Sequence, residues 1–251
     1  MTPEAAVATT GAVVIGVVDA LIVARVLRAY GRSRRRPHLV IAAGIAASYV
    51  AVIGACLVLG AHGDPGLASG SWWTVARSAG LLGPALAYGL VGVFAAEAFA
   101  RRQVTKRLSF VVLLALVAVA AAALVLEAPA VATPATMRWS LRVPFVALSL
   151  AGSLGGGLRA LRLTRAYRAA RSSGRPVDPV ALGRMHVMAQ GFVAMAIGQL
   201  ALIGFAHEGR FDSITGLVMV SLVMLGGLGF ALSCVATWAT PAWLRTRWEA
   251  A

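Results

Sequence analysis

Seven long stretches of apolar residues dominate the pattern of the chain. They cover residues 7–28, 39–61, 77–100, 108–127, 142–162, 183–205 and 213–238. About 20 apolar residues in a helix cross the ~30 Å hydrocarbon core of a bilayer. The stretches lack the alternation of a barrel strand, and in lipid a helix satisfies its own backbone. The pattern predicts an all-α, polytopic membrane protein: a bundle of seven transmembrane helices in a single domain, residues 1–251, with an interfacial C-terminal tail, 239–251.

The basic residues between these stretches predict the orientation. Nineteen of the 23 Lys and Arg residues fall in the loops after the first, third and fifth stretches or in the tail. The other side holds only Arg77, Arg138, Arg142 and Arg210. Cytoplasmic loops carry the excess of Lys and Arg. We therefore expect the N-terminus outside the cell and the C-terminus in the cytoplasm.

Composition supports a membrane location. Hydrophobic residues make up 59% of the 251 positions and charged residues 13%, against about 25% charged in soluble domains. The net charge of +14 would suggest nucleic acid in a soluble protein, but its one-sided placement instead indicates anionic lipids on the cytoplasmic face. The N-terminus lacks the features of a cleaved signal peptide, so the first stretch is expected to remain in the mature protein. We expect a multi-pass protein of the cell (plasma or inner) membrane, without a nucleic-acid partner.

Two basic segments are expected to contact lipid or a partner. From Arg159 to Arg171 (RALRLTRAYRAAR), an arginine stands at every third position. Voltage-sensing helices have this spacing, but countercharges are scarce, which favours a cytoplasmic continuation of the fifth helix to about Arg171. In the tail, two tryptophans and two arginines suit the headgroup layer after a turn at Pro241. The expected contact residues are Arg165, Arg168, Arg171, Trp243 and Arg245.

Asp19 is the most informative polar residue, because an ionisable group inside the membrane marks a function or a paired partner. Its positions three and four residues away are apolar or Gly, so its own helix provides no partner. Tyr49 and Gln190 reach a similar depth on other spans. We predict a hydrogen-bonded layer of Asp19, Tyr49 and Gln190, either as a structural network or as a site for a ligand, ion or proton.

Small residues and cysteines predict packing. Gly152 and Gly156 form a GxxxG pair, which lets helices approach closely. We expect it to serve packing within one bundle, with a homodimer through the fifth span as the alternative. Cys56 and Cys234 fall near opposite membrane faces and are expected to remain unbonded.

No catalytic, cofactor or metal site is predicted. The lone Lys106 lies in a loop, so a retinal Schiff base in the seventh span is excluded, and no Ser/His/Asp set is visible. An enzyme is disfavoured. An outer set has residue types that suit a divalent metal, but its spacing favours solvated loop residues: His62, Asp64, His207, Glu208 and Asp212.

Two segments resemble a family of signalling proteins. The start of the sixth stretch, Arg184 to Phe192 (RMHVMAQGF), and the segment Pro241 to Glu249 (PAWLRTRWE) after the seventh are similar to seven-transmembrane-helix sensor modules of bacterial, actinomycete-like signalling proteins. The resemblance covers the topology of the whole chain and about twenty residues in detail. In those modules the last helix leads into an output domain, whereas this sequence stops at Ala251. The resemblance implies either output through a separate cytoplasmic signalling partner or that this sequence is a fragment of a longer protein.

The sequence thus favours a non-catalytic membrane sensor or receptor-like module that acts through a partner. The alternatives are a transporter or channel that uses Asp19, and an accessory structural subunit of a membrane complex. An internal inverted repeat would favour a transporter, but the odd number of stretches and the lack of similarity between the halves argue against one.

Overall fold

The protein folds into long helices. A computed structural model describes residues 3–60, 70–100, 102–128, 131–204 and 214–250, and within these ranges it contains no strand. The predicted all-α class is confirmed. The described residues form eight α-helices and two short 3₁₀ turns: α1 (Pro3–Ser33), α2 (Arg36–Gly60), α3 (Gly70–Phe99), α4 (Gln103–Leu126), η1 (Pro134–Thr136), α5 (Trp139–Ser172), α6 (Pro179–Ala201), η2 (Leu202–Gly204), α7 (Ile214–Trp238) and α8 (Ala242–Ala250).

Six helices in the described ranges, α2 to α7, are long and apolar enough to cross a bilayer. Such lengths and compositions are those of a multi-pass membrane protein. α1 is also long, at 31 residues, but Asp19, Arg25 and Arg28 interrupt its apolar sequence. α8 has nine residues and is too short to cross.

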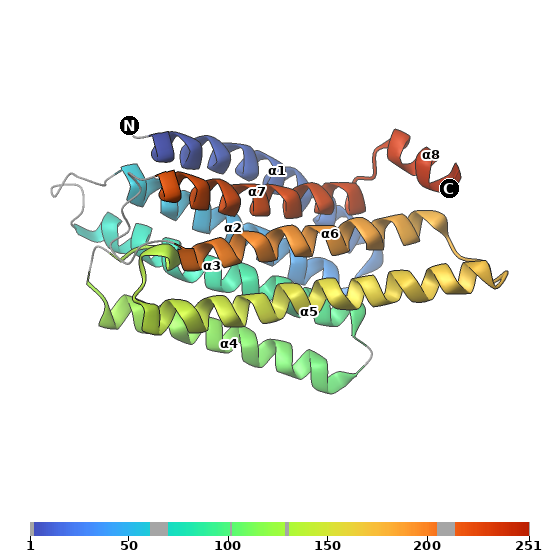
Figure 1. The fold of residues 1–251 in the computed structure, drawn as a ribbon, viewed down its shortest axis with the longest axis horizontal. Helices are drawn as coiled ribbons and strands as arrows, with labels where there is room; N and C mark the ends of the chain where they lie inside the picture. The colour runs from blue at the N-terminus through green and yellow to red at the C-terminus, as the bar shows by residue number, and fades with distance from the viewer. Residues whose placement is uncertain (1–2, 61–69, 101, 129–130, 205–213, 251) are drawn as a thin grey trace.

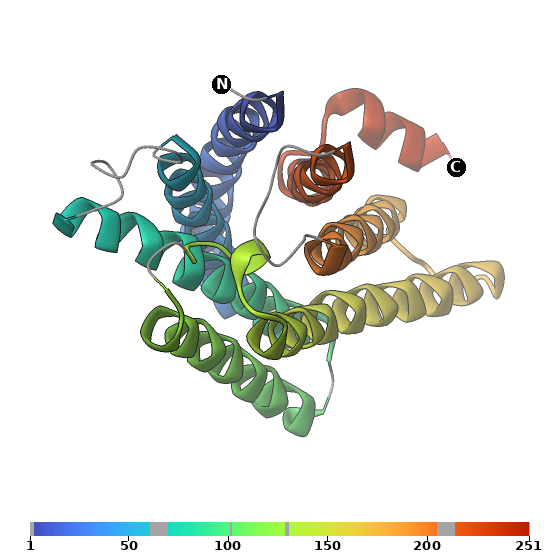
Figure 2. The same cartoon turned by 60° about the vertical axis from the view of Figure 1, so that its left-hand side comes forward.

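The helices form a ring with one helix outside it. α1 packs against α2 and α7, α2 against α3, α3 against α5, α5 against α6, and α6 against α7. α4 lies outside this ring against α3 and α5 (Figure 2). α1 begins at one end of the bundle and α8 lies at the other (Figure 1).

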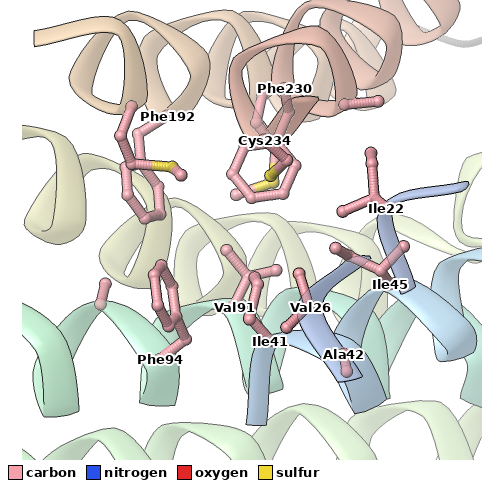
Figure 3. Packing of buried hydrophobic residues seen from close by; sticks show 14 residues of the cluster. Ile22, Val26, Ile41, Ala42, Ile45, Val91, Phe94, Phe192, Phe230 and Cys234 are labelled. Atoms are coloured by element: carbon pink, nitrogen blue, oxygen red, sulfur yellow. The ribbon is translucent and has the colours of Figure 1, made fainter. Parts of the chain in front are cut away.

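The main core lies inside this ring. Its buried side chains come from α1, α2, α3, α6 and α7, and include Ile22, Ile45, Phe94, Phe192 and Cys234 (Figure 3). A second cluster, with Leu81, Leu116 and Phe145, joins α4 to α3 and α5. α4 buries few other side chains, so most of its very apolar surface faces outward, as expected of a helix in contact with lipid.

Glycines set the closest contacts between helices. A Cβ added at Gly152 would lie 3.2 Å from the Cα of Gly92, so α3 and α5 nearly touch backbone to backbone. Gly156 lies against the side chains of Ala95 and Phe192. The GxxxG face of the fifth span is therefore used inside the bundle, as the packing interpretation expected.

The fifth helix runs past its neighbours. α5 ends at Ser172, and Gly174 has a φ of +79°, a conformation that suits Gly and stops the helix. The predicted end of the fifth helix near Arg171 is confirmed. α6 then begins at Pro179 after Asp178, whose carboxylate accepts a hydrogen bond from the Val180 N–H at 2.8 Å. This is a regular N-cap.

Candidate functional site

Asp19 faces the interior of the ring. Its side chain is 4% exposed, and Ile15 and Ile22, one turn away on either side, are buried on the same face. The predicted interior position is confirmed. Within the described part of the chain, Oδ2 of Asp19 has no hydrogen-bond partner. A buried carboxyl oxygen without a partner is costly and rare, which makes Asp19 the strongest candidate for a functional group.

The predicted hydrogen-bonded layer around Asp19 is not formed. Gln190 is exposed on α6, and its amide lies 3.4 Å from His186 Nε2 on the same helix. Tyr49 is 44% exposed and places the edge of its ring against Gly16. The direction of each side chain around its helix depends on packing, and in the assembled bundle both residues are exposed and neither makes a hydrogen bond with Asp19.

Cys234 on α7 is a titratable neighbour of Asp19. The carboxyl group lies within electrostatic range of the thiol. Cys234 is buried and is not in a disulfide, as expected. The side chain of Cys56 lies outside the described residues.

The arginine-rich end of α5 forms a surface with the start of α6 and with α8. We call residues 159–184 and 242–250 together the basic extension. Arg165, Arg168 and Arg171 are exposed there. They are not buried against Asp19 or Glu97, and Glu97 instead pairs with Lys106 at 3.5 Å. The arrangement gives no support to a voltage sensor.

Within this extension, α8 packs against the start of α6. The indole ring of Trp248 occupies the space where Gly183 of α6 would carry a Cβ, and Arg184 Nε donates to Thr240 Oγ1 at 3.0 Å. The tail was expected to lie among lipid headgroups, which stays a prediction; its Trp248 packs on α6, where Gly183 leaves a flat site for a ring. Trp243 is 67% exposed. Arg245 donates to Glu249 at 2.8 Å, which raises the pKa of Arg245.

The opposite end of the bundle contains a polar cluster that the sequence did not reveal. Arg77 of α3 donates four hydrogen bonds to backbone carbonyls at and after the end of α4, the shortest to Val131 O at 2.7 Å. The Glu127 carboxylate accepts from the Arg138 N–H at 2.9 and 3.2 Å. Both are charge-assisted bonds. These bonds hold the connection between α4 and α5 against the N-terminal part of α3.

Arg142 completes this cluster, which we call the outer cap (Arg77, Glu127, Arg138 and Arg142). Its side chain is fully buried, donates twice to Met137 O at 2.7 and 3.0 Å, and stacks on Trp139. Glu127 lies within electrostatic range of both Arg77 and Arg142. In the sequence, the only indication of this cluster is that the acidic residue Glu127 falls among the three arginines at this end of the bundle. The polar side chains of Arg77, Glu127 and Arg142 all have partners, as is typical of a polar network that stabilises the fold.

A second polar contact lies inside the ring. Ser153 of α5 donates to Gln199 Oε1 at 2.7 Å, and both side chains are buried. Gln199 Nε2 has no partner among the described residues. The contact joins α5 to α6 but brings together no acid, base and nucleophile.

No cofactor or metal geometry accompanies these groups. In the residues that the structure describes, no three His, Cys, Asp or Glu side chains are placed to hold a metal ion. The outer set of His62, Asp64, His207, Glu208 and Asp212 lies outside the described residues. A shallow groove of about 430 Å³ between α2 and α3 is apolar and includes Val50, Val75 and Leu82. It fits a lipid chain better than a polar substrate.

Comparisons of this chain with protein-family models, with curated proteins and with solved structures find no match.

Proposed function

We propose that the chain crosses the cell membrane seven times, with its N-terminus outside and its C-terminus in the cytoplasm. The excess of Lys and Arg at the α8 end supports this orientation. α1 supports the seventh crossing, because its 31 residues span about 46 Å. Its interrupting Asp19 is buried within the ring rather than presented to lipid.

The directions of α1 and α7 agree with an odd number of crossings. Gly11 of α1 lies against Met224 of α7, and Ile15 lies against Gly227 one turn later. Residue numbers rise together along this contact, so the two helices run parallel. First and last spans that run parallel leave the two ends of the chain on opposite sides of the bilayer.

Within this topology we infer a sensor or receptor-like module that acts through a cytoplasmic partner. The observation that carries this proposal is the basic extension, in which α5 continues to Ser172 and α8 packs on the start of the next helix, α6. α5 has 34 residues, or about 51 Å, while the hydrocarbon needs about 30 Å. About 20 Å of this helix therefore lies outside the hydrocarbon, as a rigid connection between the bundle and the cytoplasm.

The position of the arginines favours a protein partner for the far end of α5. If the hydrocarbon begins near Trp139, it ends near Arg159. Arg168 and Arg171 then lie about 13 and 18 Å further on, past the headgroup layer of roughly 5–8 Å. Arg159 and Arg162 are at the level of anionic lipids, whereas Arg168 and Arg171 reach an acidic surface of a soluble protein.

Photo-crosslinking in cells tests this proposal. A photoreactive amino acid at Arg168 should give a protein adduct, and one at Leu114, which is 68% exposed on α4, should give lipid adducts only. The Arg168 adduct should disappear when residues 240–251 are deleted or Arg165 and Arg171 are changed to Gln. Adducts to membrane subunits at Leu114, with none at Arg168, would favour an accessory subunit.

A transporter is the second candidate, and the unpartnered Oδ2 of Asp19 favours it. An intramembrane carboxyl group can exchange an ion or proton during transport. Purified protein alone in liposomes should then support flux, and Asp19→Asn should abolish it. Flux of this kind without any partner would contradict the sensor proposal.

A further inference from the structure

The contact between α1 and α7 shows which residues surround Asp19. Continuing the parallel α1–α7 contact by one turn from Ile15 and Gly227 brings Asp19 to the level of Ala231, beside Cys234. Ile22, the next buried residue of α1, belongs to the same cluster as Ile45, Phe230 and Cys234 (Figure 3). Asp19 therefore lies on the contact between α1 and α7, under an apolar cover.

Neither α2 nor α7, the two helices that pack against α1, places a described cationic side chain beside Asp19. The sequence of α7, Ile214–Trp238, contains no charged residue. In α2 the basic groups, Arg36 and His38, stand at its start, and no charged residue follows them in the helix. The remaining titratable groups on these two helices are Cys234 and Tyr49 within the described side chains, and Tyr49 makes no hydrogen bond with Asp19. On α1 itself, Arg25 is exposed.

An ionised carboxylate in this position would have a buried oxygen, Oδ2, that is neither solvated nor paired among the described residues. Such a charge inside the membrane costs several kcal/mol, and a buried group without a counter-ion takes up a proton instead. A protonated carboxyl group is neutral and leaves only an ordinary buried polar group. The packed arrangement of α1 against α7 is therefore compatible with the acid form of Asp19 and not with its anion.

We propose that Asp19 is a proton-binding site on the α1–α7 contact, occupied when the two helices are packed as in this structure. Release of the proton converts the carboxyl group to a carboxylate, and the proton passes to water. The carboxylate then needs water itself, so α1 and α7 must separate near Asp19. Asp19 lies about 9 Å from the level of Arg25, so exchange takes place with the side that bears the basic extension.

Carbodiimide labelling tests the binding site directly. Dicyclohexylcarbodiimide reacts with protonated carboxyl groups in apolar surroundings. With the full chain in lipid nanodiscs, mass spectrometry should locate the adduct at Asp19 and find none in Asp19→Asn. Glu97, which pairs with Lys106, is the internal control and should remain unlabelled. Labelling of Glu97 with none at Asp19 would overturn the proposal.

Infrared spectroscopy provides a second, independent measurement. The difference spectrum between wild type and Asp19→Asn should contain the carbonyl band of a protonated acid, and this band should weaken as the pH rises from about 5 to about 9. A carboxylate band from Asp19 throughout this range would mean that a cation is bound there, and would overturn the proposal. Neither result depends on a partner, so a failure here is distinct from a failure of the proposed sensor function.

The helix separation needs its own measurement. Spin labels at Leu27 and Leu232, both exposed, can be placed in a chain with Cys56→Ser and Cys234→Ala. The distance between them should increase over the pH range in which the acid band disappears, and should stay constant with Asp19→Asn. A constant distance in both proteins would overturn the coupling of the proton to this contact.

Discussion

The two ends of the bundle bury ionisable groups in opposite ways. At one end, Arg77, Glu127 and Arg142 of the outer cap each meet an opposite charge or a backbone group. Toward the other end, Asp19 is buried with a carboxyl oxygen that has no partner in the described chain. Both sites contain buried charge-bearing side chains, but only the first satisfies them.

This difference in hydrogen bonding gives the two ends different expected roles, one in stabilising the fold and one in function. A saturated cluster stabilises one arrangement, since any displacement breaks several bonds at once. An unsatisfied group makes its arrangement depend on what binds to it, here a proton. The outer cap should therefore hold the bundle in place, while the end near Asp19 and the basic extension should respond to signals or partners.

Glu127→Ala should have the largest effect on stability. The substitution leaves Arg77 and Arg142 without their counter-charge and the Arg138 N–H without its acceptor. We expect a loss of about 3–5 kcal/mol in the free energy of unfolding, measured by denaturant titration in detergent. Arg138→Ala is the matched control, because its exposed side chain is removed while its backbone N–H remains. A loss below about 1 kcal/mol for Glu127→Ala would show that the cap is not structural.

Arg142→Gln should cost about 2–3 kcal/mol by the same titration, because it removes a buried guanidinium and leaves Met137 O and the Glu127 charge less satisfied. The triple change of Arg165, Arg168 and Arg171 to Gln should stay within about 0.5 kcal/mol, since these side chains are exposed. Equal losses in the free energy of unfolding for Arg142→Gln and the triple variant would show that the two ends of the bundle contribute equally to stability.

Asp19→Leu should act in the opposite direction. Leu has the branching of Asp without its polar atoms, so it should stabilise the packed state by about 1–2 kcal/mol. Ser153→Ala, which removes a buried hydrogen bond to Gln199, should instead destabilise the protein by about 1 kcal/mol. Thermal unfolding of both variants at one pH makes the comparison. A destabilised Asp19→Leu would indicate a partner for Asp19.

Gly183→Ala should have the smallest effect on the bundle. The added Cβ collides with the ring of Trp248, so α8 should leave α6 while the free energy of unfolding changes by less than about 0.5 kcal/mol. Trypsin should then cut at Arg245 or Arg247 severalfold faster. Gly31→Ala is the control, because no atom lies within 4 Å of its added Cβ, and its cleavage should match wild type.

The sequence predicted what depends on position along a helix. Apolar length identified the helices, and the arginine spacing with Gly174 and Pro176 predicted the end of α5 within one residue of Ser172. Burial of Asp19 followed from the cost of a charge in lipid. These properties depend on a fixed rise per residue and on the solvent, both of which are known without a structure.

The sequence could not predict which way side chains point around their helices. Tyr49 and Gln190 were expected at the depth of Asp19 but are exposed, because the contacts of α2 and α6 decide their rotation. The pairing of Glu127 with the Arg138 N–H and the docking of Trp248 on Gly183 join positions through a turn or across distant helices. Each of these depends on the assembled bundle rather than on local pattern.

The parallel contact between α1 and α7 also has a consequence for the order of synthesis. The ring closes only when the last spanning helix joins the first, and 195 positions separate Asp19 from Ile214. At 5–20 residues per second, a ribosome needs about 10–40 s to make that length. Asp19 is thus among the first residues made and among the last enclosed. A chain interrupted before α7 displays in lipid a carboxyl group that the finished protein conceals.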